Sequence, residues 1–430
     1  MSTLVIGGGL SGLVHARALS KAGEDVVVVE KGSDPGGAVR TIEKNGYLLE
    51  LGPNTVRPTA RLLDLCRDLG LESEMVLSDP GLPRFVDRGG RLRRIPFPAL
   101  GLAAAVRAGA ELFVRAAPAA EEESAFDWVS RRFGSGMAER VFEPFVSGIF
   151  AGDARRLSMA AAFPKFSAAE RDHGGVLRSL LQTRGTRPKA RARGLLSFRR
   201  GLATLPGAIA ASLGDHFHPG VSVESVAPGG SGWVAETSAG RISAGRLVIA
   251  TSAGEAARIC GPFAPAAAAS LRDIPSPALC VAHCSWHASS FRRFPRGFGH
   301  LCTPSERRRI LGAVWSSSVF SGRAPAGRVL MTFFLGGRRT PEWADVEVSQ
   351  LPNLIAAEVR EPLGVTDLPE LVHREVYRSS IPQYEAGHLG RIAALEAAES
   401  LHSGLKFLGN YRGGVSVGDV VDNAAIISPP

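Results

Sequence analysis

The sequence predicts an α/β domain combined with an α+β region in a chain of 430 residues. Its first thirty residues alternate between strand-like and helix-like patterns around a glycine-rich turn, which is typical of a parallel sheet. Between residues 59 and 148, apolar residues recur at three- and four-residue spacing, which indicates several helices. Strand-like apolar runs between residues 279 and 335 then indicate a second, separate sheet.

Length and composition describe a folded chain of two or three packed units. Hydrophobic residues make up 45% of the chain and charged residues 21%, so a disordered or fibrous protein is excluded. No apolar run reaches the roughly 18 to 20 residues that span a bilayer. The longest candidate, residues 99–117, is interrupted by Arg107, Glu111 and Arg115. Any membrane contact is therefore expected to be peripheral.

The chain is basic, with 50 Lys and Arg residues against 41 Asp and Glu residues. An arginine-rich surface suits a carboxylate substrate or an anionic membrane surface. A solvated arginine-rich face is an equal alternative. The basic stretch lacks interleaved aromatic residues and any known binding module, so we expect no nucleic-acid partner. Five scattered cysteines and the lack of a secretory leader favour a reducing cytoplasm.

The N-terminal segment fits a dinucleotide-binding turn. Residues 3–6 form an expected strand, Gly7-Gly8-Gly9-Leu10-Ser11-Gly12 follows, residues 13–22 form an expected helix, and a second strand ends at Glu30. The first glycine makes the turn, the second admits the pyrophosphate, and the third lets the helix pack on the strand. We expect Glu30 to bind ribose hydroxyls, which disfavours a 2′-phosphate and hence NADP.

A second glycine pair distinguishes this chain from a simple NAD domain. It lies in Lys31-Gly32-Ser33-Asp34-Pro35-Gly36-Gly37-Ala38-Val39-Arg40, and Gly52-Pro53-Asn54-Thr55 follows. Here the chain resembles the flavin amine oxidase and porphyrinogen oxidase superfamily. In that superfamily the glycine pair and the basic residue line the diphosphate, and the later Gly-Pro lies beside the isoalloxazine ring. The resemblance implies FAD as the cofactor.

The resemblance also implies a set of FAD-binding residues. Among them, Val223 stands where the superfamily binds adenine through a valine backbone, and the segment around Ser416 closes over the flavin. The expected residues are Gly7, Gly8, Gly9, Leu10, Ser11, Gly12, Glu30, Lys31, Gly36, Gly37, Ala38, Arg40, Gly52, Pro53, Asn54, Thr55, Val223, Val415, Ser416 and Val417.

Longer blocks resemble one family within this superfamily, the oxygen-dependent protoporphyrinogen and coproporphyrinogen oxidases. These blocks lie, in order, at residues 131–164, 297–337, 381–388 and 408–419, so the likeness covers essentially the whole chain. It implies that Arg84 pairs with a substrate propionate. It also implies that the remaining site residues surround the tetrapyrrole, although ordinary core packing is the alternative for each. These residues are Gly148, Ile149, Phe298, Leu301 and Phe334.

The implied reaction is the FAD-dependent oxidation of a porphyrinogen to the porphyrin, with O2 as acceptor and H2O2 as by-product, in haem biosynthesis. Protoporphyrinogen IX is the preferred substrate and coproporphyrinogen III the alternative. A flavin amine oxidase and a flavin-less binding relative are the competing classes. The expected partners are the tetrapyrrole with its propionates, O2, an anionic membrane surface and a second copy in a homodimer. The location expected is the cytoplasm or the inner face of the cell membrane.

No catalytic base and no metal site is assigned. Cys280, His283, Cys284 and His287 have suggestive chemistry, but strand alternation places the two cysteines on one face and the two histidines on the other.

Three units are expected. The FAD-binding domain comprises residues 1–83, 190–260 and 376–430, the helical lobe residues 84–189, and the substrate-binding domain residues 261–375. The family usually ends in a helix of a dozen or more residues. Here that closing helix is expected to be nearly absent, which would weaken FAD binding.

Overall fold

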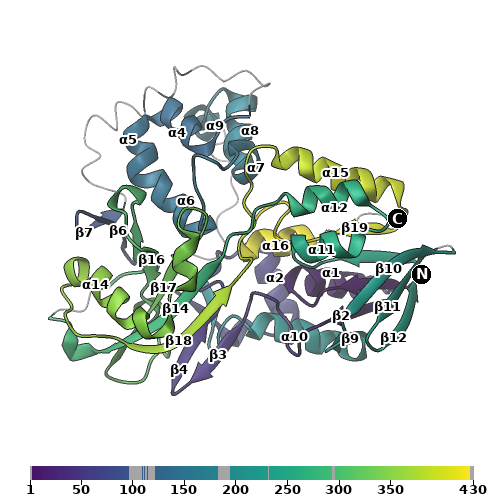
Figure 1. The fold of residues 1–430 in the computed structure, drawn as a ribbon, viewed down its shortest axis with the longest axis horizontal. Coiled ribbons are helices and arrows are strands. Elements are labelled where there is room, and N and C mark those ends of the chain that lie inside the picture. Colours follow the sequence, from purple (N-terminus) through teal and green to yellow (C-terminus); the bar gives the residue numbers. More distant parts are fainter. Residues whose placement is uncertain are drawn as a thin grey trace.

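The computed structural model describes residues 2–95, 109, 111, 114, 122–182, 194–230, 232–292 and 296–426. Figure 1 shows a parallel-sheet unit near the N-terminus, a second sheet beside it, and a group of helices above the second sheet. Among the described residues, no helix has the length and apolar character that crossing a bilayer requires.

Five parallel strands form the first sheet. β1 lies at its centre, hydrogen-bonded to β13 on one side and β2 on the other. The spatial order is β19 (Leu405–Phe407), β13 (Arg246–Ile249), β1 (Thr3–Ile6), β2 (Val26–Glu30) and β9 (Phe217–Pro219). Strands from distant parts of the chain thus meet in one sheet, as the α/β prediction required.

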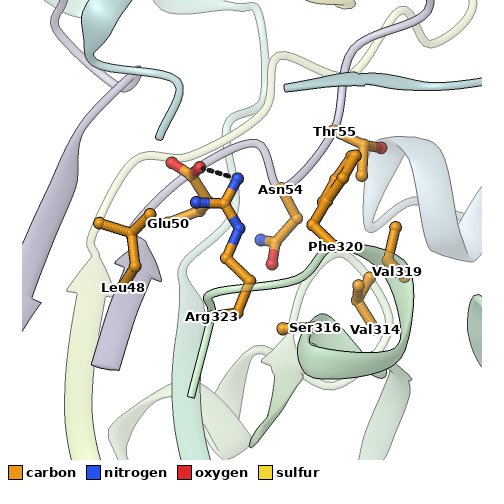
Figure 2. A pocket seen from close by; sticks show the side chains of 9 residues that line it. All are labelled: Leu48, Glu50, Asn54, Thr55, Val314, Ser316, Val319, Phe320 and Arg323. Atoms are coloured by element: carbon orange, nitrogen blue, oxygen red, sulfur yellow. Dashed lines mark ion pairs between the residues drawn. The ribbon is translucent and has the colours of Figure 1, made fainter. Parts of the chain in front are cut away.

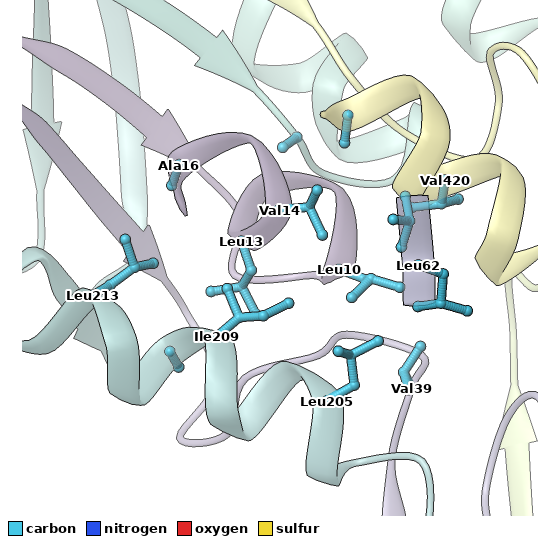
Figure 3. Close-up of a cluster of buried hydrophobic side chains, with 14 of the residues drawn as sticks. Leu10, Leu13, Val14, Ala16, Val39, Leu62, Leu205, Ile209, Leu213 and Val420 are labelled. Carbon is cyan, nitrogen blue, oxygen red and sulfur yellow. The ribbon is translucent and has the colours of Figure 1, made fainter. Parts of the chain in front are cut away.

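Helices cover one face of this sheet, and a small sheet with further helices covers the other. Figure 3 shows the first of these two cores, where Leu13 of α1 faces Ile209 of α10, and Leu10 lies near Leu62 and Val420. The helices of this core are α1 (Leu10–Lys21), α2 (Ala60–Asp68), α10 (Thr204–Leu213) and α16 (Val417–Ala424). The elements on the other face are β10 (Val223–Gly229), β11 (Gly232–Thr237), β12 (Gly240–Ala244), α11 (Ala253–Cys260), α12 (Pro265–Arg272) and α15 (His388–Leu401).

Seven strands form the second sheet. Its order is β18 (Glu370–Tyr377), β14 (Leu279–His287), β17 (Arg328–Gly336), β16 (Ile310–Val314), β15 (Gly299–Cys302), β6 (Arg84–Arg88) and β7 (Arg91–Ile95). One face packs against α14 (Leu351–Leu363) around a core that includes Cys280, Cys284 and Phe333. The other face is turned toward the first sheet and carries the candidate site.

A helical lobe lies above the second sheet (Figure 1). Its core includes Phe126, Trp128 and Phe150, and Arg132 is buried in contact with Glu111 and Glu170. A single π-helical turn, η4 (Ala138–Phe142), leads into α6 (Glu143–Phe150). The other helices are α4 (Ala125–Phe133), α5 (Ser135–Met137), α7 (Met159–Ala162), α8 (Pro164–His173) and α9 (Val176–Gln182).

Two small antiparallel pairs and several 3₁₀ turns complete the described fold. The pairs are β3 (Thr41–Lys44) with β4 (Tyr47–Glu50), and β5 (Met75–Leu77) with β8 (Leu196–Phe198). The short helices are η1 (Glu72–Glu74), η5 (Gly214–His216), η6 (Ala288–Ser290), η7 (Pro304–Glu306), η8 (Pro341–Asp345), η9 (Val348–Gln350) and α13 (Ser316–Val319).

The structure differs from several local expectations. The apolar alternation of residues 246–250 is typical of an antiparallel meander, but β13 joins the parallel sheet between β1 and β19. Residues 218–226 have the pattern of one strand, but they are divided into β9 and β10, which belong to different sheets. The helix-like pattern of residues 100–116 lies almost entirely outside the described residues.

Two chain segments pack in a different unit from the one predicted from the sequence. Residues 84–95 were expected to begin the helical lobe, but they form the β6–β7 hairpin at the edge of the seven-stranded sheet. Residues 265–272 were expected in the substrate-binding domain, but α12 packs in the core of the parallel-sheet unit beside α11 and α15.

The closing helix is present, which corrects the expectation that it would be nearly absent. α16 spans eight residues and is capped by Ser416, whose hydroxyl accepts a hydrogen bond from the Asp419 N–H at 3.2 Å. Val420 and Val421 are buried against α1, and the Ala424 carbonyl lies 2.9 Å from Nδ1 of His15. The sequence obscured this helix because it is only eight residues long and its last turn contains Asp422 and Asn423, which are weak helix formers.

Candidate functional site

The glycine turn between β1 and α1 has the geometry that the sequence predicted. Gly7 has φ = 111°, a conformation that side chains disfavour, and a Cβ there would lie 2.7 Å from the carbonyl oxygen of Ala250. A Cβ on Gly12 would overlap the carbonyl oxygen of Gly7. These two glycines therefore allow the helix and strand to approach each other closely.

Gly9 differs from both, because nothing lies within 4 Å of the position where its Cβ would be. Gly9 caps α1 without a side-chain hydrogen bond, and the first turn of α1 carries no acidic residue. The N–H groups at the start of α1 thus face open space at the positive end of the helix dipole. Leu10 contributes only its backbone here, since its side chain is buried in the core.

The second glycine pair lies directly against the first turn. Gly36 donates its N–H to the Gly8 carbonyl at 2.8 Å, and a Cβ on Gly37 would lie 3.2 Å from Cα of Gly9. Both have positive φ angles, 115° and 62°. Gly52 in turn packs so closely on the Ala38 carbonyl that a Cβ would overlap it. Three separate segments thus form one glycine-lined surface.

The carboxylate of Glu30 lies at the end of β2, beside this surface. Its Oε2 accepts the Gly8 N–H and its Oε1 accepts the Gly32 N–H, both at 2.7 Å. Each oxygen keeps a lone pair for a ribose hydroxyl. Val223 begins β10 nearby, and its carbonyl accepts a hydrogen bond from Nη2 of Arg258 at 2.7 Å. Lys31 is exposed, and Arg40 pairs with Glu375 of β18 at 3.2 Å.

Tyr384 fixes the segment that precedes α16. Its hydroxyl donates to the Asn410 carbonyl at 2.6 Å and accepts the Gly414 N–H at 3.0 Å. Burial raises the pKa of this phenol well above its usual range, so it stays a neutral donor. Val415, Ser416 and Val417 follow directly and start α16 beside α1.

These observations fit a flavin dinucleotide. The open cradle at Gly9 and the uncapped start of α1 suit the diphosphate, and the carboxylate of Glu30 suits a ribose. The residues that would hold the group come from the β1–α1 turn, the second glycine pair and the segment around Ser416. The groups the sequence predicted are therefore brought together by the fold.

A pocket lies where the two sheets meet, at Asn54 and Thr55 (Figure 2). Glu50 and Arg323 form an ion pair on one side of it, with 3.6 Å between Oε1 and Nη2. Burial raises the pKa of Glu50, an effect that the Thr41 hydroxyl and Arg323 partly oppose, and burial lowers the pKa of Arg323. The remaining lining residues are Leu48, Val314, Ser316, Val319 and Phe320.

The expected substrate residues lie on the adjoining part of the seven-stranded sheet. Leu301 of β15 pairs with Gly312 of β16, and Gly312 pairs with Phe334 of β17. Directly paired residues project to the same face, so two apolar side chains flank a position without a side chain. Gly148 of α6 lies against this row, because a Cβ there would contact Cδ2 of Leu301. Ile149 is 40% exposed on the same helix.

Arg84 stands at the start of β6, next to this row. Its guanidinium carbon lies 5.2 Å from the centre of the Phe298 ring, and Gly299 is its register partner on β15. The side chain is exposed. The structure therefore places the cation and the aromatic ring together and leaves the guanidinium accessible to a carboxylate.

Several site residues were not predicted from the sequence. Arg323 and Phe320 enter the pocket from a loop with no recognisable motif, so only the three-dimensional fold reveals them. Ser316 belongs to a block that resembles the family's substrate domain, and this was the available signal. Glu50 lies two residues before the predicted Gly52-Pro53 segment, but strand alternation with apolar Tyr47, Leu49 and Leu51 places it on the other face, so no pattern in the sequence indicated its burial.

Comparison with known proteins identifies the family. Residues 10–424 match the model of the flavin-containing amine oxidoreductases. The chain belongs to the flavin-containing amine oxidoreductase family. Its cofactor is therefore FAD, and it is an oxidoreductase of this family.

Curated relatives within this family carry two related names. A chloroplastic protoporphyrinogen oxidase of Oryza sativa subsp. japonica is 34% identical, covering 98% of this chain and 86% of the relative. The chloroplastic protoporphyrinogen oxidase 1 of Spinacia oleracea is 32% identical, covering 99% and 83%. Coproporphyrinogen III oxidase of Bacillus subtilis (strain 168) is 26% identical, covering 97% and 95%.

Solved structures share the family fold. A protein from Exiguobacterium sp. 255-15, provisionally named a protoporphyrinogen oxidase, has a TM-score of 0.80 at 19% identity and covers 99% of this chain and 97% of its own. Cyclohexylamine oxidase from Brevibacterium oxydans IH-35A has a TM-score of 0.70 at 19% identity and covers 99% and 98%. Both confirm the predicted combination of a dinucleotide-binding sheet with a second sheet.

Proposed function

We propose that this protein oxidises a porphyrinogen to the porphyrin, most directly protoporphyrinogen IX to protoporphyrin IX, with O2 as the electron acceptor. The likeness to protoporphyrinogen oxidases extends over the whole chain at up to 34% identity, which supports this substrate class over an amine. Coproporphyrinogen III is the alternative substrate, supported by the likeness to the coproporphyrinogen III oxidase of Bacillus subtilis (strain 168).

The row of Leu301, Gly312 and Phe334 is the observation that carries the proposal. Leu301 and Phe334 place apolar side chains on the sheet face that α6 adjoins, and such an apolar row suits one face of a large, flat macrocycle. Val314, two residues after Gly312 on the same strand face, lines the pocket at Asn54 and Thr55. The macrocycle and the cofactor ring would therefore lie side by side on one sheet.

The bound cofactor would accept a hydride from a methylene bridge of the substrate. The protein's own residues position the substrate for this step. The Arg84 guanidinium pairs with a propionate at the edge of the macrocycle, while Leu301, Phe334 and α6 exclude water from its face. Three rounds remove six electrons and produce three molecules of H2O2.

The test is a direct assay of both substrates. Protoporphyrinogen IX and coproporphyrinogen III are prepared anaerobically and mixed with the purified protein in air, while porphyrin fluorescence and flavin absorbance are recorded together. We expect bound FAD and faster formation of protoporphyrin. A rate no greater than autoxidation with both substrates contradicts the proposal, and faster coproporphyrin formation moves it to the alternative substrate. Amines serve as negative controls.

We further propose that the enzyme acts in the cytoplasm, with the helical lobe against an anionic membrane surface, and that it forms a homodimer. Exposed Phe145, Ile149 and Phe166 on the lobe support a peripheral apolar contact. The described cysteines are all unpaired, which suits a reducing compartment. Sedimentation with phosphatidylglycerol vesicles and analytical ultracentrifugation test these two statements.

A further inference from the structure

A chain of hydrogen-bonded side chains runs from the pocket into the seven-stranded sheet. Ser316 lines the pocket, and its Oγ lies 2.9 Å from Oγ1 of Thr332. Oγ1 of Thr332 lies 3.1 Å from Nδ1 of His283. Thr332 and His283 are register partners on β17 and β14, so the sheet itself holds the second link in place. All three residues are buried.

Within the part of the chain that the structure describes, the ring nitrogen of His283 that lies opposite Nδ1 makes no contact that explains its position. This nitrogen, Nε2, is buried without a hydrogen-bond partner among the described residues, an arrangement that costs stability and therefore calls for an explanation. His283 projects from the strand face opposite Cys280 and Cys284, which belong to the apolar core. Burial lowers its pKa to about 3, so the resting ring is neutral and can accept a proton.

Among the described residues the hydrogen-bonded chain ends at His283, and further ionisable groups lie between this ring and the surface. The next residue across the sheet is His373 of β18, the other register partner of His283, with 6.1 Å between the ring centres. Nε2 of His373 lies 3.5 Å from Oε2 of Glu375, and Glu375 pairs with the partly exposed Arg40. Ionisable groups therefore lead from the buried imidazole to solvent.

We propose that Ser316, Thr332 and His283 form a proton relay that receives the proton lost from a pyrrole nitrogen of the substrate. This inference rests on the function proposed above and assigns the proton acceptor that the family resemblance left unnamed. Hydroxyl groups suit the task because each can accept one proton while donating another.

The proton balance of the reaction requires such an acceptor. Loss of a hydride from a methylene bridge leaves the macrocycle with a positive charge, which makes a pyrrole N–H acidic. Its proton passes to Ser316 Oγ, the Ser316 proton passes to Thr332 Oγ1, and the Thr332 proton passes to Nδ1 of His283. The N–H electron pair stays on nitrogen and forms a C=N bond. Reduction of O2 to H2O2 by the hydride consumes one proton per round, so release and uptake balance.

The low basicity of buried His283 suits a group that passes a proton on and does not retain it. An imidazole that kept its proton would block the next of the three rounds. Because burial disfavours the charged ring, His283 releases the proton again, and His373 and Glu375 are ionisable groups on the side toward solvent, with no hydrogen bond from His283 to His373 among the described residues.

The decisive variant is Thr332→Val, which keeps the branched shape of the side chain and removes only the hydroxyl. Ser316→Ala interrupts the relay at its first link. Ser285→Ala is the matched control, since Ser285 is a buried hydroxyl on the same strand face as His283 and bonds instead to Tyr47 and Arg328. Each variant is purified with FAD bound, and its flavin spectrum and melting temperature are compared with those of the wild type.

Anaerobic single-turnover experiments with protoporphyrinogen IX then measure the rate of flavin reduction in H2O and D2O. We expect Thr332→Val and Ser316→Ala to slow it by roughly 100-fold, because hydride loss that leaves a cationic macrocycle is reversed unless the proton departs. The substrate dissociation constant should stay unchanged, and the solvent isotope effect should change. Ser285→Ala should keep the wild-type rate. An independent readout is the ¹⁵N resonance of His283 Nδ1 in the oxidised protein, which should shift in Thr332→Val and stay in place in Ser285→Ala.

The outcomes separate the relay from the proposed function. If the wild type oxidises porphyrinogen and both relay variants keep its rate and isotope effect, the relay is wrong while the function stands. An unshifted His283 resonance in Thr332→Val also overturns it. If the wild type oxidises neither porphyrinogen, the function fails and the relay fails with it.

Discussion

Glu50 of β4 and Arg323, which follows α13, form a buried ion pair that joins the two sheet units beside the pocket. Their side chains are 4% and 3% exposed. Glu50 also accepts the Thr41 hydroxyl at 2.6 Å and the Leu202 N–H, and Arg323 donates to Ser197 and to the Phe198 carbonyl. The pair thus fixes the position of one unit relative to the other.

Arg323→Met is expected to lower the free energy of unfolding by about 3–5 kcal/mol, because it leaves an unpaired carboxylate in the interior. Glu50→Gln combined with Arg323→Met should recover part of the loss. Burial already raises the pKa of Glu50, and loss of Arg323 raises it further. A carboxyl group whose pKa is raised in the folded protein stabilises the fold at low pH, and this stabilisation is lost as the pH rises through the pKa of the folded protein. The free energy of unfolding of Arg323→Met in urea should therefore fall as the pH rises. The free energy of unfolding of the double variant should not change over that range.

Gly9 and Gly12 give opposite predictions within one turn. Gly9→Ala adds a methyl group to open space in the diphosphate cradle, so we expect FAD affinity to fall at least tenfold, or about 1.4 kcal/mol, with the apoprotein's melting temperature unchanged. Gly12→Ala forces α1 away from β1 and should instead destabilise the apoprotein by several kcal/mol. Flavin titration and thermal unfolding separate the two. Equal flavin affinity in Gly9→Ala and wild type would contradict the placement of the cradle.

Arg84 is expected to bind substrate and not to take part in hydride transfer. Arg84→Ala should raise the KM for porphyrinogen roughly tenfold, with kcat nearly unchanged, because a charge-assisted contact of about 1.5 kcal/mol is lost in both ground and transition states. Arg94→Ala is the matched control, since Arg94 lies on the same hairpin but pairs with Phe85 and projects to the opposite face. A lower kcat at constant KM in Arg84→Ala would disprove this role.

His15 of α1 makes the contact between α1 and α16 sensitive to acid. Burial lowers its pKa to about 4, although the hydrogen bond with the Ala424 carbonyl partly opposes this. A depressed pKa gives stability that is complete above the ordinary value of about 6.5 and is lost as pH falls toward 4. Between pH 6 and 4.5, the unfolding free energy of the wild type should fall more steeply than that of His15→Gln, by up to about 1.4 kcal/mol per pH unit. Parallel curves would show that His15 does not titrate on unfolding.

The sequence predicted the parts of the molecule whose chemistry is local. The turn from Gly7 to Gly12 needs only its neighbours, because the tight turn and the helix start are encoded within one short motif. Glu30 and the glycine pair at Gly36 follow at fixed spacing, and the structure places both against Gly8, while their contacts with FAD stay a prediction.

Features that depend on distant pairing could not be predicted in this way. β6 pairs with β15 although more than 200 residues separate them, so nothing in the local pattern of residues 84–95 indicates a sheet edge. β13 has the same short apolar pattern as a meander strand, and only its pairing with β1 and β19 places it in the parallel sheet. Arg323 and Thr332 likewise acquire their roles through partners that the fold supplies.

The packing of α16 on α1 also has a consequence for biosynthesis. The cradle for the cofactor begins at residue 7, yet its supporting helix is completed only at residue 424, and β19 joins the same sheet at residues 405–407. During translation the N-terminal strand and helix therefore lack their final neighbours until residue 424 has left the ribosome. We expect flavin capture to follow this step, because the cradle has no supporting helix before then.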